Sequence, residues 1–209
     1  MDPDFYADRR RLAEYFEKEW FDHVLAKGCL PPSLFEFPPF DPARLYCESH
    51  EKAAEFLSGT LRSVGVAPTR LLEVGSALGR GFYELCRRTP SVRSATLVEP
   101  SQNFARTFDS LFRSHESRLY PVLWGNTGLV DVTFDSTHLR DTCRHVVISV
   151  INAPHDQLGD DLGLFDPVLC FNVLDQCHAP LSLVDRLKRH TAPGGVLALS
   201  CTYQWNKIH

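Results

Sequence analysis

The chain has 209 residues, of which 44% are hydrophobic and 23% charged, and its formal net charge is −4. This size and composition predict one ordinary globular domain with a substantial core. The acidic balance argues against a general electrostatic grip on nucleic acid, and no apolar run approaches the roughly 18 residues of a membrane span. The charged N-terminus does not look like a secretion signal, and seven cysteines without a Cys-x-x-Cys pair favour reduced thiols in the cytoplasm.

The N-terminal third predicts two helices, at residues 2–27 and 48–64. The first has one apolar face, made by Phe5, Leu12, Tyr15, Phe16, Trp20 and Val24. Between the helices, residues 29–44 carry five prolines and three phenylalanines, which indicate a loop whose aromatic rings are buried. We assign residues 1–66 to an N-terminal helical cap.

From residue 67 onward, apolar strands alternate with helices. The expected strands are 71–75, 94–99, 145–151, 167–172 and 195–200; the expected helices are 80–88, 101–113 and 180–190, with Ser101 as the N-cap of the second. Continuous apolar strands separated by helices predict an α/β fold: a Rossmann-like, doubly wound, mostly parallel sheet with helices on both faces. This core is expected to span residues 67–209.

One segment interrupts the alternation. Residues 120–134 resemble two short strands around Gly125-Asn-Thr-Gly128, which is a hairpin signature. We expect a hairpin insertion near 118–135 that lies on the sheet, near the mouth of any binding site.

The most informative stretch is the loop after the first strand of the core. Glycines at 75, 79 and 81 follow a strand that carries Glu73, and the next strand ends at Glu99. Such glycines let the backbone approach a ligand, and an acid at the end of the second strand can accept hydrogen bonds from ribose hydroxyls. The pattern predicts a nucleoside-binding half-site.

Ala77 bears on which nucleoside is bound. The dinucleotide fingerprint Gly-x-Gly-x-x-Gly has its middle glycine where this loop has Ala77, and that glycine allows close approach of a pyrophosphate. This departure disfavours a nucleotide-dependent oxidoreductase, which is one alternative. An acid on the first strand, Glu73, fits a nucleoside that carries an amino acid.

The loop resembles the first motif of class I S-adenosylmethionine-dependent methyltransferases, Glu/Asp-x-Gly-x-x-x-Gly. The resemblance extends to Glu99, to Asn172 after the fourth strand and to the Ala192-Pro-Gly-Gly195 turn before the fifth. It implies the cofactor S-adenosylmethionine, bound by Glu73, Gly75, Ser76, Ala77, Gly79, Glu99, Pro100, Asn152 and Asn172. Asn152 stands where many members have an acid beside the adenine. Helix capping is the alternative role for the two glutamates.

Two further segments carry a narrower resemblance. Cys170–Cys177 is similar to the Asn-Leu-Leu/Ile-Asp-Arg segment of the ovothiol biosynthesis methyltransferase domain and of seven-strand protein-histidine methyltransferases. Ser200-Cys-Thr-Tyr-Gln-Trp205 is similar to the ovothiol group's Ser-Pro-Tyr-x-Trp. The resemblance implies N-methylation of an imidazole, in a histidine-like small molecule or a protein histidine. Asp175 would then fix the imidazole tautomer, Asn172 would orient the substrate, and Tyr203 and Trp205 would wall the pocket.

Simpler roles exist for the same residues. Asn172 and Asp175 could cap the helix that begins near Ala179, and the aromatic rings of Tyr203 and Trp205 could belong to the core. Cys170, Cys177 and His178 invite comparison with a metal site, but buried cysteines usually behave as small hydrophobes, so we expect no metal.

The chain departs from the methyltransferase pattern after the fifth strand, where such enzymes normally add an antiparallel hairpin. An uncovered fifth strand would expose a sheet edge. Three explanations are open: a truncated chain, replacement by the N-terminal helices and the 120–134 hairpin, or a partner chain or oligomer that covers the edge. A catalytically weak partner subunit and a small-molecule methyltransferase with an unrelated substrate are the functional alternatives.

Overall fold

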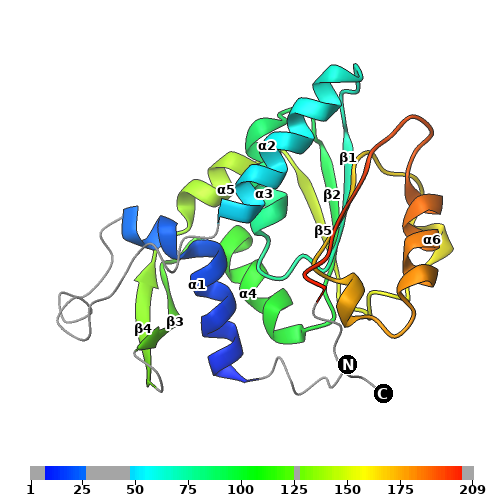
Figure 1. The fold of residues 1–209 in the computed structure, drawn as a ribbon. Helices are drawn as coiled ribbons and strands as arrows, with labels where there is room; N and C mark the ends of the chain where they lie inside the picture. The colour runs from blue at the N-terminus through cyan, green and yellow to red at the C-terminus, as the bar shows by residue number, and fades with distance from the viewer. Residues whose placement is uncertain (1–7, 27–47, 125–127, 204–209) are drawn as a thin grey trace.

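A computed structural model describes residues 8–26, 48–124 and 128–203 of the chain. Five parallel strands form one sheet in the order β5-β2-β1-β6-β7 (Figure 1). Their bounds are Arg70–Val74 for β1, Ser94–Val98 for β2, Val147–Ile151 for β5, Val168–Phe171 for β6 and Leu197–Ser200 for β7. Because all pairings are parallel, the carboxyl ends of the five strands meet at one edge.

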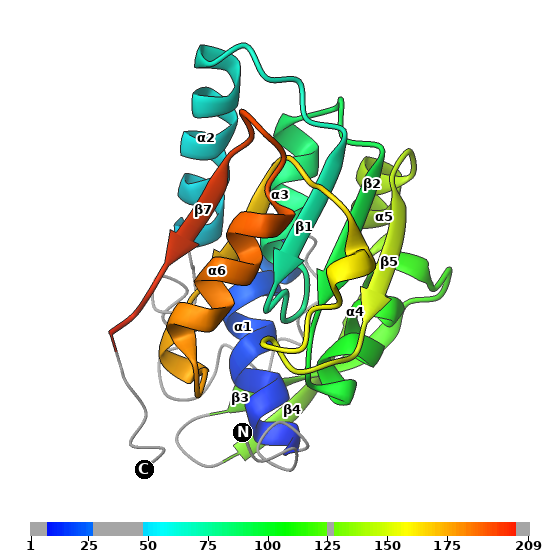
Figure 2. The ribbon, with the colours of Figure 1, turned by 90° about the vertical axis from the view of Figure 1, so that its right-hand side faces the viewer.

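Helices cover both faces of this sheet, as the alternating pattern predicted. The helices α2 (Glu48–Ser63), α3 (Arg80–Arg88), α4 (Gln102–Arg113) and α5 (Thr137–Cys143) lie on one face, and α6 (Pro180–His190) lies on the other (Figure 2). Successive β1 side chains point to opposite faces, so Leu71 joins the larger hydrophobic cluster and Leu72 the smaller one. The Rossmann-like fold prediction is confirmed. None of the described helices is both long and apolar enough to cross a bilayer.

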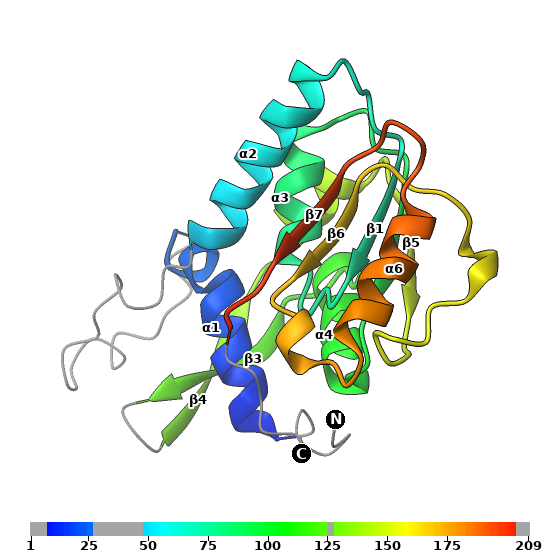
Figure 3. The same cartoon turned by 45° about the vertical axis from the view of Figure 1, so that its right-hand side comes forward.

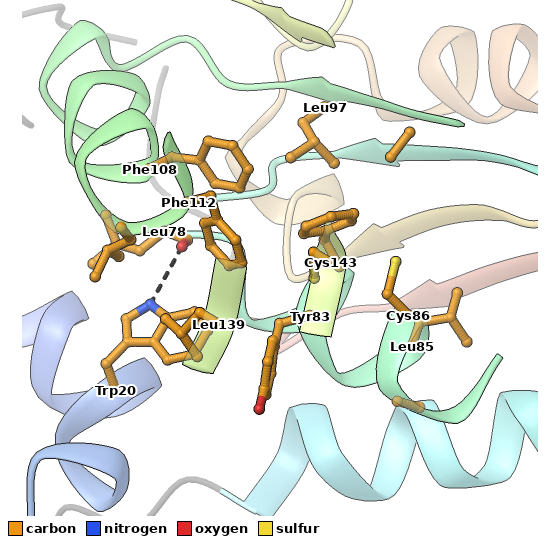
Figure 4. Packing of buried hydrophobic residues seen from close by; sticks show 14 of the residues in the cluster. Trp20, Leu78, Tyr83, Leu85, Cys86, Leu97, Phe108, Phe112, Leu139 and Cys143 are labelled. Atoms are coloured by element: carbon orange, nitrogen blue, oxygen red, sulfur yellow. Dashed lines mark hydrogen bonds between the residues drawn. The ribbon is translucent and has the colours of Figure 1, made fainter. Parts of the chain in front are cut away.

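Helix α1 (Arg9–Ala26) lies beyond the carboxyl ends of the strands (Figure 3). Its apolar face is fully buried at Phe16 and Trp20, as its periodicity predicted. The Trp20 indole Nε1 donates a 3.2 Å hydrogen bond to the carbonyl of Leu78, in the glycine loop, beside the rings of Phe108 and Phe112 (Figure 4). Residues 2–7 of the predicted helix and the predicted packed loop 29–44 lie outside the described residues.

The predicted hairpin is present as β3 (Arg118–Trp124) and β4 (Gly128–Phe134), but its location differs from our expectation. The two strands form a separate sheet that packs on α1, where the rings of Phe16 and Tyr120 stack at 4.7 Å and Glu17 accepts a hydrogen bond from the Leu123 N–H. The expectation that the hairpin lies on the main sheet was therefore wrong. It does not replace a neighbour of β7, which among the described strands pairs with β6 alone.

Candidate cofactor and acceptor site

The glycine loop makes a tight turn directly after β1. Gly75 has φ 76°, and a Cβ there would overlap Val173 Cγ2; Gly79 has φ 89°, and a Cβ there would crowd the Phe108 ring. Ala77 also has a positive φ, of 45°, which L-residues seldom adopt. The sequence therefore places glycine where contact as well as backbone conformation requires it.

Glu99 holds this turn from the end of β2. Its Oε2 accepts a 2.9 Å hydrogen bond from the Ala77 N–H, and its Oε1 accepts one of 2.8 Å from the Ser101 N–H. Ser101 in turn caps α4 by accepting from the Phe104 N–H at 3.2 Å, as predicted. A carboxylate has about four lone-pair sites, so Glu99 retains capacity for a ligand hydroxyl.

A second carboxylate, which the motifs did not reveal, binds the other end of the loop. Oε2 of Glu19, on α1, accepts from the N–H groups of Leu78 at 3.1 Å and Arg80 at 3.2 Å. These amides form the N-terminus of α3, where an anion is stabilised by unsatisfied donors and by the helix dipole. Glu19 falls three residues after Phe16 on the buried face of α1, and this was the only sequence signal for its role.

The Arg80 side chain also connects α1 to α3, next to the Glu19 contact. Its guanidinium pairs with Asp22 at 2.8 Å and with Glu84 at 2.9 Å, and it also donates to the Glu19 carbonyl. The Arg80 and Glu84 side chains are 3% and 1% exposed, so the pairing is almost fully desolvated. Charged groups buried to this degree make a rigid joint, because neither partner can separate without leaving a buried charge.

Three buried carboxyl groups surround the loop. Burial raises the pKa of Glu19 and of Glu99 to about 7, against the opposing effect of their backbone hydrogen bonds. Burial raises the pKa of Glu73 to about 8; the Phe82 N–H lowers it and Glu99 raises it further. Glu73 Oε2 makes no hydrogen bond with any described residue. A cation bound beside the loop would favour the ionised form of these carboxyls.

A cavity of about 370 Å³ opens beside the loop. Its wall at the strand ends includes Gly75, Ala77, Glu99, Pro100 and Asn172. The facing wall comes from one side of α1, at Arg11, Glu14, Tyr15, Lys18 and Glu19, and from the start of α2 at Ser49 and His50. Val173, Gln176 and Thr202 complete one end, and His155 lies beside Gly75.

Some predicted cofactor residues lie behind this wall rather than on it. Glu73, Ser76 and Gly79 shape the loop without lining the cavity. The Asn152 side chain donates to the carbonyls of Glu99 at 2.8 Å and Pro100 at 3.0 Å, so its amide stabilises the turn after β2. The Asn152 Oδ1 is the atom that would accept a hydrogen bond from an adenine amine, so direct contact of Asn152 with a ligand stays a prediction.

The predicted catalytic residues are separated by the structure. Asn172, with φ 57°, lines the cavity, and its Oδ1 accepts a 3.0 Å hydrogen bond from Ser200 Oγ. Asp175 is only 2% exposed, does not line the cavity and accepts a hydrogen bond from the hydroxyl of Thr202, which does. In this structure Asp175 therefore meets the cavity only through Thr202, and its direct contact with a substrate stays a prediction.

The remaining predictions concern Tyr203, Trp205 and helix capping. Tyr203 is 78% exposed and is not among the described residues that line the cavity, so its role as a pocket wall stays a prediction. Trp205 lies outside the described residues. The N-cap of α6 is Ala179, and no described side chain caps this helix, so capping does not explain Asn172 or Asp175.

Two cavity histidines were missed by the sequence reasoning. His50 stands in the first turn of α2, and His155 follows Pro154 in the segment between β5 and β6. Burial lowers the pKa of His155 to about 4, and it lowers that of His50 as well. His155 follows the Asn152 motif closely, and this proximity was its only signal.

Metal ligation finds no geometric support in the described part of the chain. No group of three or more His, Cys, Asp or Glu side chains there could hold an ion. Cys170 is fully buried, and burial raises the pKa of its thiol well above its usual range. It therefore behaves as an uncharged core residue.

Comparison with known proteins agrees with this geometry. No curated protein sequence matches the chain. An S-adenosylmethionine-dependent methyltransferase from Clostridium acetobutylicum has a similar structure, with a TM-score of 0.51 at 13% identity, over 85% of this chain and 54% of that one. An amino pentose methyltransferase from Micromonospora echinaspora, with S-adenosylmethionine bound, gives a TM-score of 0.48 at 18% identity, over 72% of this chain and 50% of the other.

A sugar N-methyltransferase from Streptoalloteichus gives a TM-score of 0.49 at 18% identity, over 73% of this chain and 48% of that chain. The chain thus spans about half the length of these proteins. Residues 43–205 match a family described as a methyltransferase domain, and this match covers more than half of the sequence. The chain belongs to the methyltransferase domain family.

Proposed function

We propose that this chain transfers a methyl group from S-adenosylmethionine to a small acceptor held in the cavity beside the glycine loop. The hydrogen bonds of the glycine loop support this choice of cofactor. The amides of Ala77, Leu78 and Arg80 are bonded to the carboxylates of Glu99 and Glu19. In a dinucleotide site, amides at this position receive a pyrophosphate.

Two carboxylates at the anion site would repel a phosphate and attract a cation. S-adenosylmethionine carries a sulfonium and an ammonium group, and its ribose offers hydroxyls to the unused lone pairs of Glu99. The sulfonium methyl is already activated, so the protein mainly positions the acceptor in line with it. The buried carboxyls therefore favour a methyltransferase over a nucleotide-dependent oxidoreductase.

For the acceptor we propose an imidazole nitrogen, in a histidine-like molecule or a protein histidine. The charged α1 wall supports a small polar acceptor, because it places Arg11, Glu14 and Lys18 along one side of the cavity. In this proposal Asp175 is a positioning residue that acts through the Thr202 hydroxyl. A small-molecule acceptor of another class is the alternative within the same chemistry.

We also propose a division of labour along the chain. Residues 1–66 would form the acceptor-facing cap, and residues 67–209 the cofactor-binding core. The support is that α1 and the start of α2 supply the wall opposite the strand ends. A partner chain or a second copy would be expected to pair with the edge of β7, whose Leu199 is 40% exposed.

Calorimetry with S-adenosylhomocysteine tests the cofactor assignment. Binding in the micromolar range is expected, and Glu99→Ala should abolish it because the variant loses both the loop contact and the ribose acceptor. Glu116→Ala, at an exposed position outside the cavity, is the matched control and should bind normally. A chain that binds NADH but not S-adenosylhomocysteine would refute the proposal.

Transfer of a radioactive methyl group tests the acceptor. L-histidine, histamine and a histidine-containing peptide are the probes, with amino sugars as the competing class. Transfer confined to the amino sugars would refute the imidazole proposal while leaving the cofactor assignment intact.

A further inference from the structure

His50 occupies the cavity in a state that is unusual for a buried imidazole. Its Nδ1 atom is buried and makes no hydrogen bond with any described residue, yet the side chain lines the same cavity as Gly75 and Glu99. A buried polar atom without a partner is normally destabilising by about 1–3 kcal/mol. Because His50 lines the cavity, its unpaired Nδ1 is suited to accept a hydrogen bond from a ligand there.

The groups around His50 act on its pKa in both directions. Burial lowers its pKa, Arg80 on α3 lowers it further, and Glu19 on α1 and Glu84 on α3 raise it. The N-terminal turn of α2 also disfavours a cation at this position. Glu19 and His50 line the same cavity, and a Glu19 carboxylate would stabilise an imidazolium at His50.

We propose that His50 is the proton acceptor of the methyl-transfer reaction, a role that rests on the proposed function. In the reaction the sulfonium S–CH₃ bond breaks as a bond forms between that carbon and the acceptor atom. The electron pair of the broken bond stays on sulfur, giving S-adenosylhomocysteine. The proton that the acceptor carries on N–H or O–H passes to Nδ1 of His50.

For an imidazole acceptor, this assignment gives His50 the task that the sequence had suggested for Asp175. A hydrogen bond from the acceptor's N–H to His50 leaves the other ring nitrogen with a free lone pair that points at the methyl group. Asp175 is less suited to this task, because it is buried and bonded to Thr202, and of the two only Thr202 lines the cavity.

His155 is the competing candidate, and its position argues for a different role. Its Nε2 lies 3.5 Å from where a Cβ on Gly75 would be, so it sits against the cofactor loop. We therefore expect His155 to affect cofactor affinity and His50 to affect turnover.

The experiment compares His50→Gln with His155→Gln and with His115→Gln, an exposed control outside the cavity. S-adenosylhomocysteine affinity is measured by calorimetry, and turnover with L-histidine and histamine is followed across pH. His50→Gln should keep its cofactor affinity within about twofold and lose turnover by roughly 100- to 10,000-fold, the range for general-base catalysis. The acid limb of the wild-type pH profile should disappear in this variant.

Unchanged turnover in His50→Gln, or a loss of cofactor affinity as large as the loss of turnover, would overturn the role of His50. A wild-type chain that fails to bind S-adenosylhomocysteine refutes the proposed function instead. Nitrogen NMR on histidine-labelled protein gives a test that needs no acceptor. With S-adenosylhomocysteine bound at neutral pH, Nδ1 of His50 should carry no proton; a protonated Nδ1 would overturn the proposal.

Discussion

Glu19 and Arg80 bind each other twice: the Glu19 carboxylate accepts from the Arg80 backbone N–H at 3.2 Å, and the Arg80 guanidinium donates to the Glu19 carbonyl. The first contact satisfies the start of α3, and the second attaches α1 to it. This pair attaches helix α1 to the end of the glycine loop, although 61 positions separate Glu19 from Arg80.

Replacing Glu19 by alanine should destabilise the fold. The change leaves the buried N–H groups of Leu78 and Arg80 without their acceptor, and each such group costs about 1–3 kcal/mol. Glu19→Gln keeps an acceptor oxygen and should be milder. Urea unfolding of both variants measures the difference; equal stabilities would contradict the capping role.

Arg80→Met should be more damaging. It leaves Asp22 and the buried Glu84 without this partner, and breaking a buried ion pair typically destabilises by about 3–5 kcal/mol. Arg93→Met, at an exposed position, is the control and should change stability by less than about 0.5 kcal/mol. Chemical unfolding measures both, and a small effect at Arg80 would show that the pairing is dispensable.

Gly75→Ala and Gly65→Ala form a matched pair. Both glycines have positive φ, 76° and 72°, but a Cβ on Gly75 would overlap Val173, whereas none of the described atoms lies within 4 Å of one on Gly65. Backbone strain alone predicts a loss of about 1 kcal/mol at Gly65, and overlap adds about 1–3 kcal/mol at Gly75. Thermal unfolding and S-adenosylhomocysteine titration should show that only Gly75→Ala also weakens binding.

Stability should fall as pH rises above about 6.5. Glu19, Glu73 and Glu99 have folded pKa values of about 7, 8 and 7, above the value of 4.5 for a free glutamate. The folded state therefore holds protons that the unfolded state has released, so their contribution is lost as pH rises through the folded pKa values.

Three histidines act in the opposite direction. Burial lowers the pKa values of His23 and His155 to about 4 and also lowers that of His50, so these groups make stability rise with pH only up to the free value of 6.5. Between about pH 6.5 and 8 the carboxyl effect should dominate. Urea unfolding across this range tests it, and Glu73→Gln should flatten the slope; an unchanged slope would contradict the raised pKa of Glu73.

S-adenosylmethionine should bind more tightly as pH rises through about 7 to 8, because its cation favours the ionised carboxyls. S-adenosylhomocysteine lacks the sulfonium charge and should show a weaker dependence. Calorimetry in buffers of different ionisation enthalpy counts the protons released. Identical pH dependence for the two ligands would mean that these carboxyls do not sense the sulfonium.

Local patterns in the sequence predicted most of the fold. Apolar runs and glycine turns located the strands, and Ser101 was recognisable as a cap because its partner is three residues away. Helix α5 was missed, because its seven residues bury only Leu139 and Cys143 and so show little periodicity. The hairpin was identified, but its docking on α1 depends on a tertiary contact between Phe16 and Tyr120.

The site was predictable only where it follows strand ends. Gly75, Glu99 and Asn172 could be placed in this way, because parallel strands bring their carboxyl ends together. Glu19 and His50 could not, because they come from helices whose position over the loop depends on packing. Sequence spacing puts Asp175 close to Asn172 but does not show its hydrogen bond to Thr202, which lines the cavity.

Helix α1 contacts both ligand environments at once: its Trp20 indole binds the Leu78 carbonyl in the cofactor loop, and its opposite side lines the cavity. If binding of one ligand shifts this helix, the site of the other changes, and thermodynamic reciprocity requires that each ligand change the other's affinity by the same factor. The β3-β4 hairpin packs on α1, so a change in the hairpin would act on both sites through this helix.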